Sequence, residues 1–356
     1  MSDSPLLLSS RIPSSCPIKD LSVVDTGAGP QVVCADSWGA VWTWEPLRDE
    51  WRKRPLVYAF TGDPLAAQYP DAENEIDTVA AAVFKGRVVL AAGGGEQAPA
   101  LWDLESGELL RGTTYDEPYV GAIATLRGEG APRFVTGSQY VGQLLVWEPS
   151  GQVPPAEVAN DLYDITSLAA AWIDGRSLVA SGGDGVVDVR DPARNEQVAS
   201  FTPDDGDVRA VALSKSKSNS SSSSTSASRL GDRPLVVAAT DAAELYVWEL
   251  SGDDSGNGDH EPVHDPITGH EDDILTLDTA AVGDRRIAVT GAADQTVRVW
   301  DLAEGTAVGA PLSGHQDDVE AVSTTTLRGR DVILSAGGDG AIRAWDLAAL
   351  LGRDTD

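Results

Sequence analysis

The chain has 356 residues, of which 42% are hydrophobic, so it holds enough apolar side chains for a large core and is not a wholly disordered polymer. Its 56 acidic residues against 26 basic ones give a formal net charge of −30, which repels nucleic-acid phosphates and anionic lipids. We therefore expect neither nucleic acid nor a membrane as partner, and favour basic proteins or cations, although the charge equally serves solubility.

The sequence also bears on where in the cell the protein is located. No run approaches the roughly 18 apolar residues of a membrane-spanning helix, and the first residues lack the basic segment of a secretory signal. The two cysteines, Cys16 and Cys34, are too few for a disulfide scaffold or a structural zinc site. These features predict a cytoplasmic protein. High Ala and Gly contents, with 21 Arg against 5 Lys, favour a bacterial source.

Along the chain, a Trp followed by an acidic residue closes an apolar, β-rich run six times. These pairs are Trp44-Glu45, Trp102-Asp103, Trp147-Glu148, Trp248-Glu249, Trp300-Asp301 and Trp345-Asp346. A seventh run has Arg190-Asp191 at this place. Before each of the seven, an acidic residue or a Tyr leads a short strand, at Asp20, Glu75, Tyr119, Asp164, Asp207, Asp273 and Asp318.

The spacing between these two markers is regular. The separations from the leading residue to the Trp or Arg are 24, 27, 28, 26, 41, 27 and 27 residues. Only the fifth stands out, and the Ser-rich stretch 214–229 inside it explains the excess. We expect that stretch to be a disordered loop. Two independent markers that recur in step indicate a repeat protein.

Each unit predicts strands broken by turns. In the sixth unit, strands are expected over 274–277, 286–290, 296–300 and 306–311, with a turn over 291–294. Four short antiparallel strands in about 40–50 residues are typical of one propeller blade.

Two units carry a more specific pattern. Gly269-His270 through Trp300-Asp301 and Gly314-His315 through Trp345-Asp346, each with its His and Trp 30 residues apart, resemble WD40 repeats. The resemblance implies an all-β fold, a seven-bladed β-propeller of four-stranded antiparallel blades that forms one domain over residues 1–356. Only 11 residues follow Trp345, too few for an outer strand in the last blade. Residues 1–13, with a strand from Pro5 to Ile12, are expected to supply it and close the ring.

The resemblance also implies a buried hydrogen-bonded tetrad in each of these two blades, made by a His, a Ser or Thr, an Asp and the Trp. The tetrads are His270, Thr290, Asp294 and Trp300, and His315, Ser335, Asp339 and Trp345. We expect them to be structural, because every member is otherwise a buried polar group without a partner.

The other five units depart from this pattern. Ten residues before the Trp or Arg they have Cys34, Ala92, Gly137, Ala180 and Ala238, none of which replaces the hydroxyl, so packing is expected to hold these blades together. Arg190 is expected to form an ion pair with Asp184 or Asp188, since an unpaired buried charge is costly. A functional notch at Arg190 is the alternative.

In WD40 propellers the residues just before the first strand of each blade surround the mouth of the central channel. By this resemblance the mouth would be ringed by Asp20, Glu75, Tyr119, Asp164, Asp207, Asp273 and Asp318. Six acids of seven predict a concentrated negative potential and a docking surface, unless the carboxylates only cap the turn into the strand. Trp38 on a turn of the first blade is expected to anchor a partner.

A candidate calcium loop lies within the acidic segment 251–265. Asp253, Ser255, Asn257, Gly258, Asp259 and Glu261 match positions 1, 3, 5, 6, 7 and 9 of a calcium-binding loop. Position 12 is His264 instead of a bidentate Glu, and no flanking helices are evident. We therefore favour a solvated acidic loop over a calcium site and expect no cofactor.

The leading hypothesis is a non-enzymatic scaffold that binds a basic or extended protein segment at its acidic face. Enzymatic motifs such as a phosphate-binding Gly loop or a nucleophile elbow are missing from the sequence. An enzyme or small-molecule binder that uses the channel mouth is the alternative, as is a regulatory or sensor subunit of a larger complex. Shifted carboxylate pKa values in a deep pocket would favour the enzyme or binder.

Overall fold

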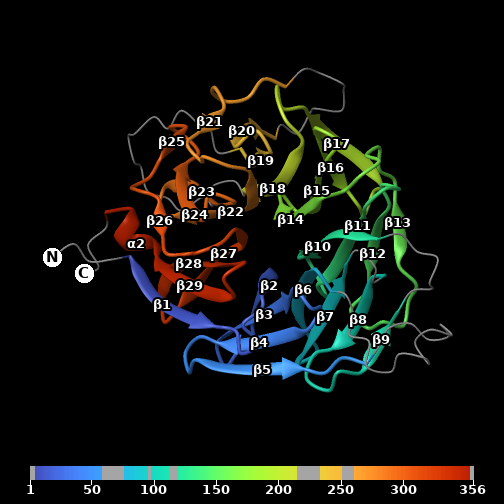
Figure 1. Ribbon diagram of the computed structural model, residues 1–356. Coiled ribbons are helices and arrows are strands. Elements are labelled where there is room, and N and C mark those ends of the chain that lie inside the picture. The colour runs from blue at the N-terminus through green and yellow to red at the C-terminus, as the bar shows by residue number, and fades with distance from the viewer. Residues whose placement is uncertain are drawn as a thin grey trace.

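The computed structural model describes residues 5–57, 76–94, 98–112, 119–214, 233–250 and 260–352. In these residues, seven antiparallel sheets follow one another around a ring (Figure 1). We number them as blades one to seven along the chain and label the strands of each blade A to D from the central axis outwards. This is the all-β, seven-bladed propeller that the repeats predict.

Blades one to three are built from consecutive strands. Blade one consists of β2 (Ile18–Asp25), β3 (Pro30–Asp36), β4 (Val41–Glu45) and β5 (Glu50–Arg54). Blade two consists of β6 (Thr78–Phe84), β7 (Arg87–Gly93), β8 (Ala100–Asp103) and β9 (Leu109–Arg111). Blade three consists of β10 (Val120–Leu126), β11 (Arg133–Ser138), β12 (Leu144–Trp147) and β13 (Ala156–Val158).

Blades four to six continue the pattern. Blade four consists of β14 (Ser167–Ile173), β15 (Arg176–Gly183), β16 (Val186–Asp191) and β17 (Glu196–Phe201). Blade five consists of β18 (Val208–Ser214), β19 (Leu235–Thr240), β20 (Glu244–Glu249) and β21 (Ile267–Thr268). Blade six consists of β22 (Ile274–Val282), β23 (Arg285–Ala292), β24 (Thr296–Asp301) and β25 (Thr306–Ala307), and β26 (Leu312–Ser313) also pairs with β24.

Blade seven joins the two ends of the chain. Its strands β27 (Val319–Leu327), β28 (Arg330–Gly337) and β29 (Ala341–Asp346) are completed by β1 (Leu6–Arg11), which pairs with β29 in antiparallel register. In Figure 1 the blue β1 lies beside the red β29. The bonds continue past both ends of β1, from Ile12 N to Gly340 O (2.9 Å) and from Asp346 N to Pro5 O (2.7 Å). The predicted closure by the N-terminal strand is therefore present.

The short helix α2 (Leu347–Leu350) follows β29 directly. Asp346 caps it, because its carboxylate accepts hydrogen bonds from the amides of Ala348 and Ala349. Blade six differs slightly from expectation in its outer strand, which is split into β25 and β26 instead of running over 306–311.

The core is a series of layers between blades. Each apolar cluster combines one face of a blade with the facing side of the next, as where Trp102 of blade two packs in one cluster with Val33 of blade one. Likewise Trp248 of blade five packs with Phe201 of blade four, their ring centroids 5.2 Å apart. Strands B and C are buried on both faces, which explains their continuous Val, Leu and Ala runs.

Candidate functional site

The predicted tetrad residues of blade six contact one another in a closed buried network. His270 Nδ1 lies 2.8 Å from Asp294 Oδ2, and His270 Nε2 lies 2.7 Å from Thr290 Oγ1. The same Thr290 oxygen accepts a 2.8 Å hydrogen bond from Trp300 Nε1. Burial lowers the pKa of His270, although Asp294 opposes the shift, so the imidazole is neutral near pH 7.

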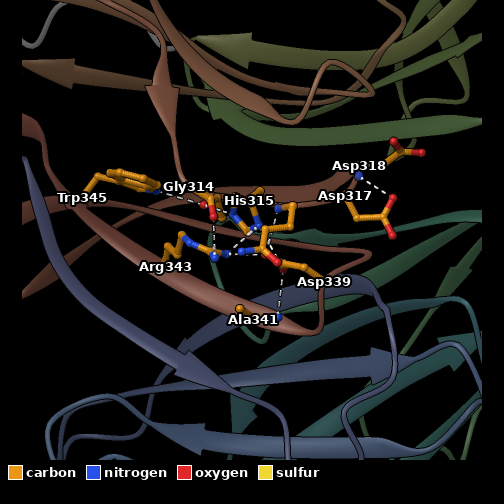
Figure 2. Close-up of polar contacts among 10 residues, drawn as sticks. Gly314, His315, Asp317, Asp318, Asp339, Ala341, Arg343 and Trp345 are labelled. Atoms are coloured by element: carbon orange, nitrogen blue, oxygen red, sulfur yellow. Dashed lines mark hydrogen bonds and ion pairs between the residues drawn. The ribbon is translucent and has the colours of Figure 1, made fainter.

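Blade seven repeats this arrangement (Figure 2). His315 Nδ1 lies 3.1 Å from Asp339 Oδ1, and His315 Nε2 lies 2.8 Å from Ser335 Oγ. Trp345 Nε1 donates a 2.9 Å hydrogen bond to the same Ser335 oxygen. Every one of these side chains is hydrogen-bonded to another protein group.

Arg343 is an additional member of the blade-seven network. Its Nη1 donates to Asp339 Oδ2 at 2.8 Å, and its Nη2 donates to the carbonyl oxygen of Gly314 at 2.7 Å (Figure 2). Burial opposes ionisation of Asp339. The Arg343 charge and the hydrogen bond from the Ala341 amide oppose the effect of burial, and the pKa of Asp339 lies well below its usual range.

Blade three also has a hydroxyl at the tetrad position, which the ten-residue spacing missed. Trp147 Nε1 donates a 3.0 Å hydrogen bond to Thr136 Oγ1. Thr136 lies opposite Leu145, two residues before the Trp, just as Thr290 lies opposite Arg298 in blade six. The expectation that Gly137 stands here is wrong because the turn between strands B and C is one residue longer than in blade six.

Blade four shows the opposite change. Its turn between strands B and C is one residue shorter than in blade six, so Ser181 and not Ala180 lies opposite Asp188 at the tetrad position. The Ser181 hydroxyl is buried and lies 3.3 Å from the carbonyl oxygen of Asp188. Two of the five blades expected to lack a hydroxyl there therefore have one.

Arg190, in the Trp position of blade four, is buried and doubly paired. Its Nε lies 2.5 Å from Asp188 Oδ2 and its Nη2 lies 2.5 Å from Asp161 Oδ2. The pair with Asp188 is one of the two that the sequence suggests, and Asp161 is a second partner that the spacing did not reveal. Asp184 does not contact Arg190, because its carboxylate accepts hydrogen bonds from two main-chain amides that precede β14.

The residues that precede the strands A lie against the B–C turn of their own blade. The carbonyl oxygens of Asp207, Asp273 and Asp318 accept hydrogen bonds of 3.1, 2.9 and 2.9 Å from amides of these turns. Tyr119 accepts a similar bond of 2.8 Å from Gln139. We call the surface made by these residues and the B–C turns the mouth face. Its members used below are Pro17, Trp38, Tyr119, Asp164, Asp207, Asp273 and Asp318.

Asp20 does not belong to this series, which corrects the sequence interpretation. In blade one it is Pro17 whose carbonyl oxygen accepts a bond from the B–C turn, at 2.8 Å from Ser37 N. Leu21 lies opposite Cys34 in the register that places Leu277 opposite Thr290, so Asp20 is three residues further along than the corresponding acids. This offset explains why the first marker separation is three residues short.

The Asp20 carboxylate instead joins blade one to blade two beside the central channel. Its Oδ2 accepts hydrogen bonds from Val79 N at 2.8 Å and from Thr78 Oγ1 at 3.0 Å. Burial raises the pKa of Asp20 to about 6, against the effect of these bonds. Two junctions away around the ring, Asp278 joins blade six to Thr324 of blade seven in the same way, with bonds of 2.7 and 2.9 Å.

Two of the remaining acids of the mouth face, Asp318 and Asp164, have other carboxylates close by. Asp207 is exposed, and Asp164, Asp273 and Asp318 are half-buried. Burial raises the pKa of Asp318, and the carboxylates of Asp317, Glu320 and Asp272 raise it further (Figure 2 shows Asp317 and Asp318). Burial and a neighbouring carboxylate likewise raise the pKa of Asp164. Lys19, whose Nζ lies 2.7 Å from Glu320, offsets part of this effect at Asp318, and the net pKa shifts of both carboxylates remain upward.

Aromatic side chains are exposed on the same face. Trp38 has 71% of its surface accessible, on a turn held by Asp36, whose carboxylate accepts bonds from Trp38 N and Ala40 N. Sequence reasoning missed a second group, Tyr140 and Tyr163, which are 55% and 67% exposed. Their signal in the sequence is an aromatic at a turn position, which predicts nothing until the turn is known to face solvent.

The strands A surround a central cavity of about 330 Å³. Asp20, Asp278 and Arg127 are the charged residues among its lining. Burial also raises the pKa of Asp278. Both carboxylates are engaged with the neighbouring blade, as described above.

Several sequence predictions lie outside the described residues. Glu75 and the calcium candidates Asp253, Ser255, Asn257 and Asp259 are among them, as is most of the Ser-rich stretch, whereas Glu261 is described and exposed. Within the described ranges, no group of three or more His, Cys, Asp or Glu side chains is placed to hold a metal ion. In those ranges we also find no helix with the length and apolar character to cross a membrane.

A ring of seven four-stranded antiparallel sheets defines the chain as a β-propeller. The sequence model of the family described as WD domain, G-beta repeat matches residues 261–301 and 307–346. The chain is thus a β-propeller whose blades six and seven match the WD40 repeat, and the matched segments carry the complete tetrads of these two blades. No curated protein was found to match the chain.

Proposed function

We propose that this propeller is a non-enzymatic scaffold that binds a basic, extended segment of another protein on its mouth face. Propellers of this family are typical protein-interaction scaffolds. The observation that carries the proposal is the crowding of carboxylates around Asp318 and Asp164 beside exposed aromatic rings. Like charges held close together destabilise one another, and a cationic ligand relieves that repulsion.

The rigid ring supports this function physically. The mouth-face residues are held by main-chain hydrogen bonds to the B–C turns, so little conformational entropy is lost when a partner docks. Negative potential attracts a basic partner over a distance, and an aromatic side chain such as Trp38 contributes contact area once the partner is bound.

A random dodecapeptide phage library selected on the intact protein tests this proposal. The acid variant combines Asp207→Asn, Asp273→Asn and Asp318→Asn. Its matched control combines Glu129→Gln, Asp174→Asn and Asp284→Asn, which removes the same charge from exposed A–B turns at the opposite ends of the strands. Selected peptides should be basic, lose about tenfold or more in affinity on the acid variant, and keep their affinity on the control. Equal affinity on both variants, or a selection without enriched peptides, contradicts the proposal.

The central cavity favours a second candidate, a small-molecule binder. Its support is the raised pKa of two buried carboxylates, Asp20 and Asp278, in a cavity of about 330 Å³. Both carboxylates already accept hydrogen bonds from a neighbouring blade, which favours the scaffold. Thermal-shift screening against polar metabolites separates the two: a ligand that stabilises the wild type but not Asp278→Asn would support the small-molecule site.

A further inference from the structure

Exposed apolar side chains gather at the junction of blades three and four on the mouth face. Tyr119, Tyr140, Val141 and Tyr163 are 46%, 55%, 58% and 67% exposed. Tyr119 and Tyr163 precede the strands A of blades three and four, and the other two lie on the B–C turn of blade three. We call these four residues the tyrosine junction. A patch of exposed apolar side chains is typical of an interaction surface.

The main chain holds the junction in place. Gln139 N donates a 2.8 Å hydrogen bond to Tyr119 O, which ties the turn to the start of blade three. On the other side, Asn160 Nδ2 donates to the carbonyl oxygens of Gly142 and Leu162, at 3.0 and 3.3 Å. Gly142 packs so closely on the Leu162 carbonyl that a Cβ there would lie 1.6 Å from its oxygen. The main chain that carries these side chains is therefore held in one position by hydrogen bonds and close packing.

The turn that displays Tyr140 is both longer and strained. In blade three, Gly137 and Leu144 pair across six intervening residues, against five between Gly291 and Val297 in blade six. Tyr140 has φ of +69°, a left-handed conformation that costs about 1–2 kcal/mol for a residue with a Cβ. A strained backbone beneath a solvent-exposed aromatic ring favours a role for Tyr140 at the surface.

The rings and charges of the junction are complementary to a guanidinium group. Tyr119 and Tyr140 lie edge-to-face, at 82° to one another with centroids 6.2 Å apart, and both side chains are partly exposed. The Asp164 carboxylate lies close to the main-chain amide of Tyr140. Asp184 Oδ2 accepts hydrogen bonds from the main-chain amides of Tyr163 and Asp164, at 3.0 and 2.9 Å. A guanidinium stacks on an aromatic face and pairs with carboxylates at the same time, which an ammonium does less well.

We propose that the tyrosine junction binds an arginine side chain of a partner protein segment, with apolar neighbours of that arginine packing on Val141 and Tyr163. This inference rests on the proposed function and assigns its specificity to one part of the mouth face. The guanidinium stacks on an exposed ring of the Tyr119–Tyr140 pair and ion-pairs with Asp164.

The peptide selection described above tests the inference with a junction variant that combines Tyr140→Gly and Tyr163→Ser. Glycine suits the φ of +69°, so Tyr140→Gly removes the ring while relieving backbone strain, and the variant should unfold at the wild-type temperature or above. Val153→Ser is the matched control, because it removes an exposed apolar side chain from a C–D turn at the opposite ends of the strands. Fluorescence polarisation then measures one enriched peptide and its versions with arginine replaced by lysine or glutamine.

We expect enriched peptides to share an arginine beside an apolar residue. Their affinity should fall about tenfold on the junction variant and on replacement of the arginine, and stay within about twofold on Val153→Ser. Peptides that lose affinity on the acid variant but keep it on the junction variant overturn this inference and leave the proposed function standing. Peptides indifferent to both variants overturn both, and peptides that bind as well with lysine or glutamine overturn the arginine assignment.

Discussion

Arg343 Nη1 lies 2.8 Å from His315 Nδ1, whereas the corresponding Arg298 of blade six lies over the Trp300 ring, 6.0 Å from its centroid. A guanidinium only donates hydrogen bonds, so His315 Nδ1 must accept, and the proton of this imidazole sits on Nε2, towards Ser335. In blade six, His270 Nδ1 faces the Asp294 carboxylate and therefore carries the proton. Two tetrads of nearly the same composition thus hold opposite tautomers.

Nitrogen-15 NMR of the histidine rings checks this assignment. At neutral pH we expect the His270 signals of an Nδ1–H tautomer and the His315 signals of an Nε2–H tautomer. Arg343→Leu removes the donor at His315 Nδ1, so His315 should change to the Nδ1–H form and donate to Asp339, while His270 stays unchanged. The same tautomer at both sites in the wild type would contradict the argument.

The number of buried partners of each hydroxyl predicts the cost of removing it. Thr290→Val leaves both His270 Nε2 and Trp300 Nε1 without their partner, and should lower the free energy of unfolding by about 2–4 kcal/mol. Thr136→Val leaves only Trp147 Nε1 without its partner and should lower the free energy of unfolding by about 1–3 kcal/mol. Urea unfolding measures both, with the exposed Thr306→Val as control. A larger loss for Thr136→Val than for Thr290→Val would refute this ordering.

Asp20 predicts a pH dependence of opposite sign to ordinary acid unfolding. Burial raises its pKa from 3.8 to about 6, so between pH 4 and 6 the native state binds more protons than the unfolded state. The free energy of unfolding must then fall as pH rises, on the order of 2–3 kcal/mol from this group. Asp20→Asn avoids this loss, and its stability relative to wild type should improve from pH 4 to pH 7 in urea titrations. For the control Asp174→Asn, which changes an exposed carboxylate, the free energy of unfolding should depend on pH as it does in the wild type. The same pH dependence in Asp20→Asn as in the wild type would rule the effect out.

Closure of the ring predicts that the first residues carry much of its stability. Removal of residues 1–13 leaves β29, whose residues are all buried, as an open edge without the bonds to β1. It also removes Ser10, whose hydroxyl accepts a 2.9 Å bond from Trp51 in blade one. We expect a loss of at least about 3 kcal/mol and a tendency to aggregate through the open edge. Removal of 353–356 is the control, and equal melting temperatures of the two truncated proteins would disprove the role of β1.

Much of the architecture was predictable because a repeat states the same local pattern several times. The Trp-acid pairs and the leading acids identified seven blades and the closing strand, since alternating apolar residues can only be buried between neighbouring sheets. The complete tetrads of blades six and seven were readable because their spacing does not vary. In blades three and four a single residue gained or lost in a turn moved Thr136 and Ser181 out of the expected place.

The sequence also predicted the places of some acidic residues near the mouth face correctly and of one wrongly. Asp164, Asp207, Asp273 and Asp318 precede their strands as the spacing predicts, but Asp20 lies inside its strand and bonds to blade two. The sequence by itself determined the number of blades, the positions of the buried Trp residues and the overall negative charge, because these follow from composition and periodicity. Only the tertiary structure decided which carboxylates face solvent, which join blades, and that three tyrosines from separate segments meet at one junction. Strand register and the packing of adjacent blades decide which of these side chains lie close together. Both depend on contacts between residues that are far apart in the chain.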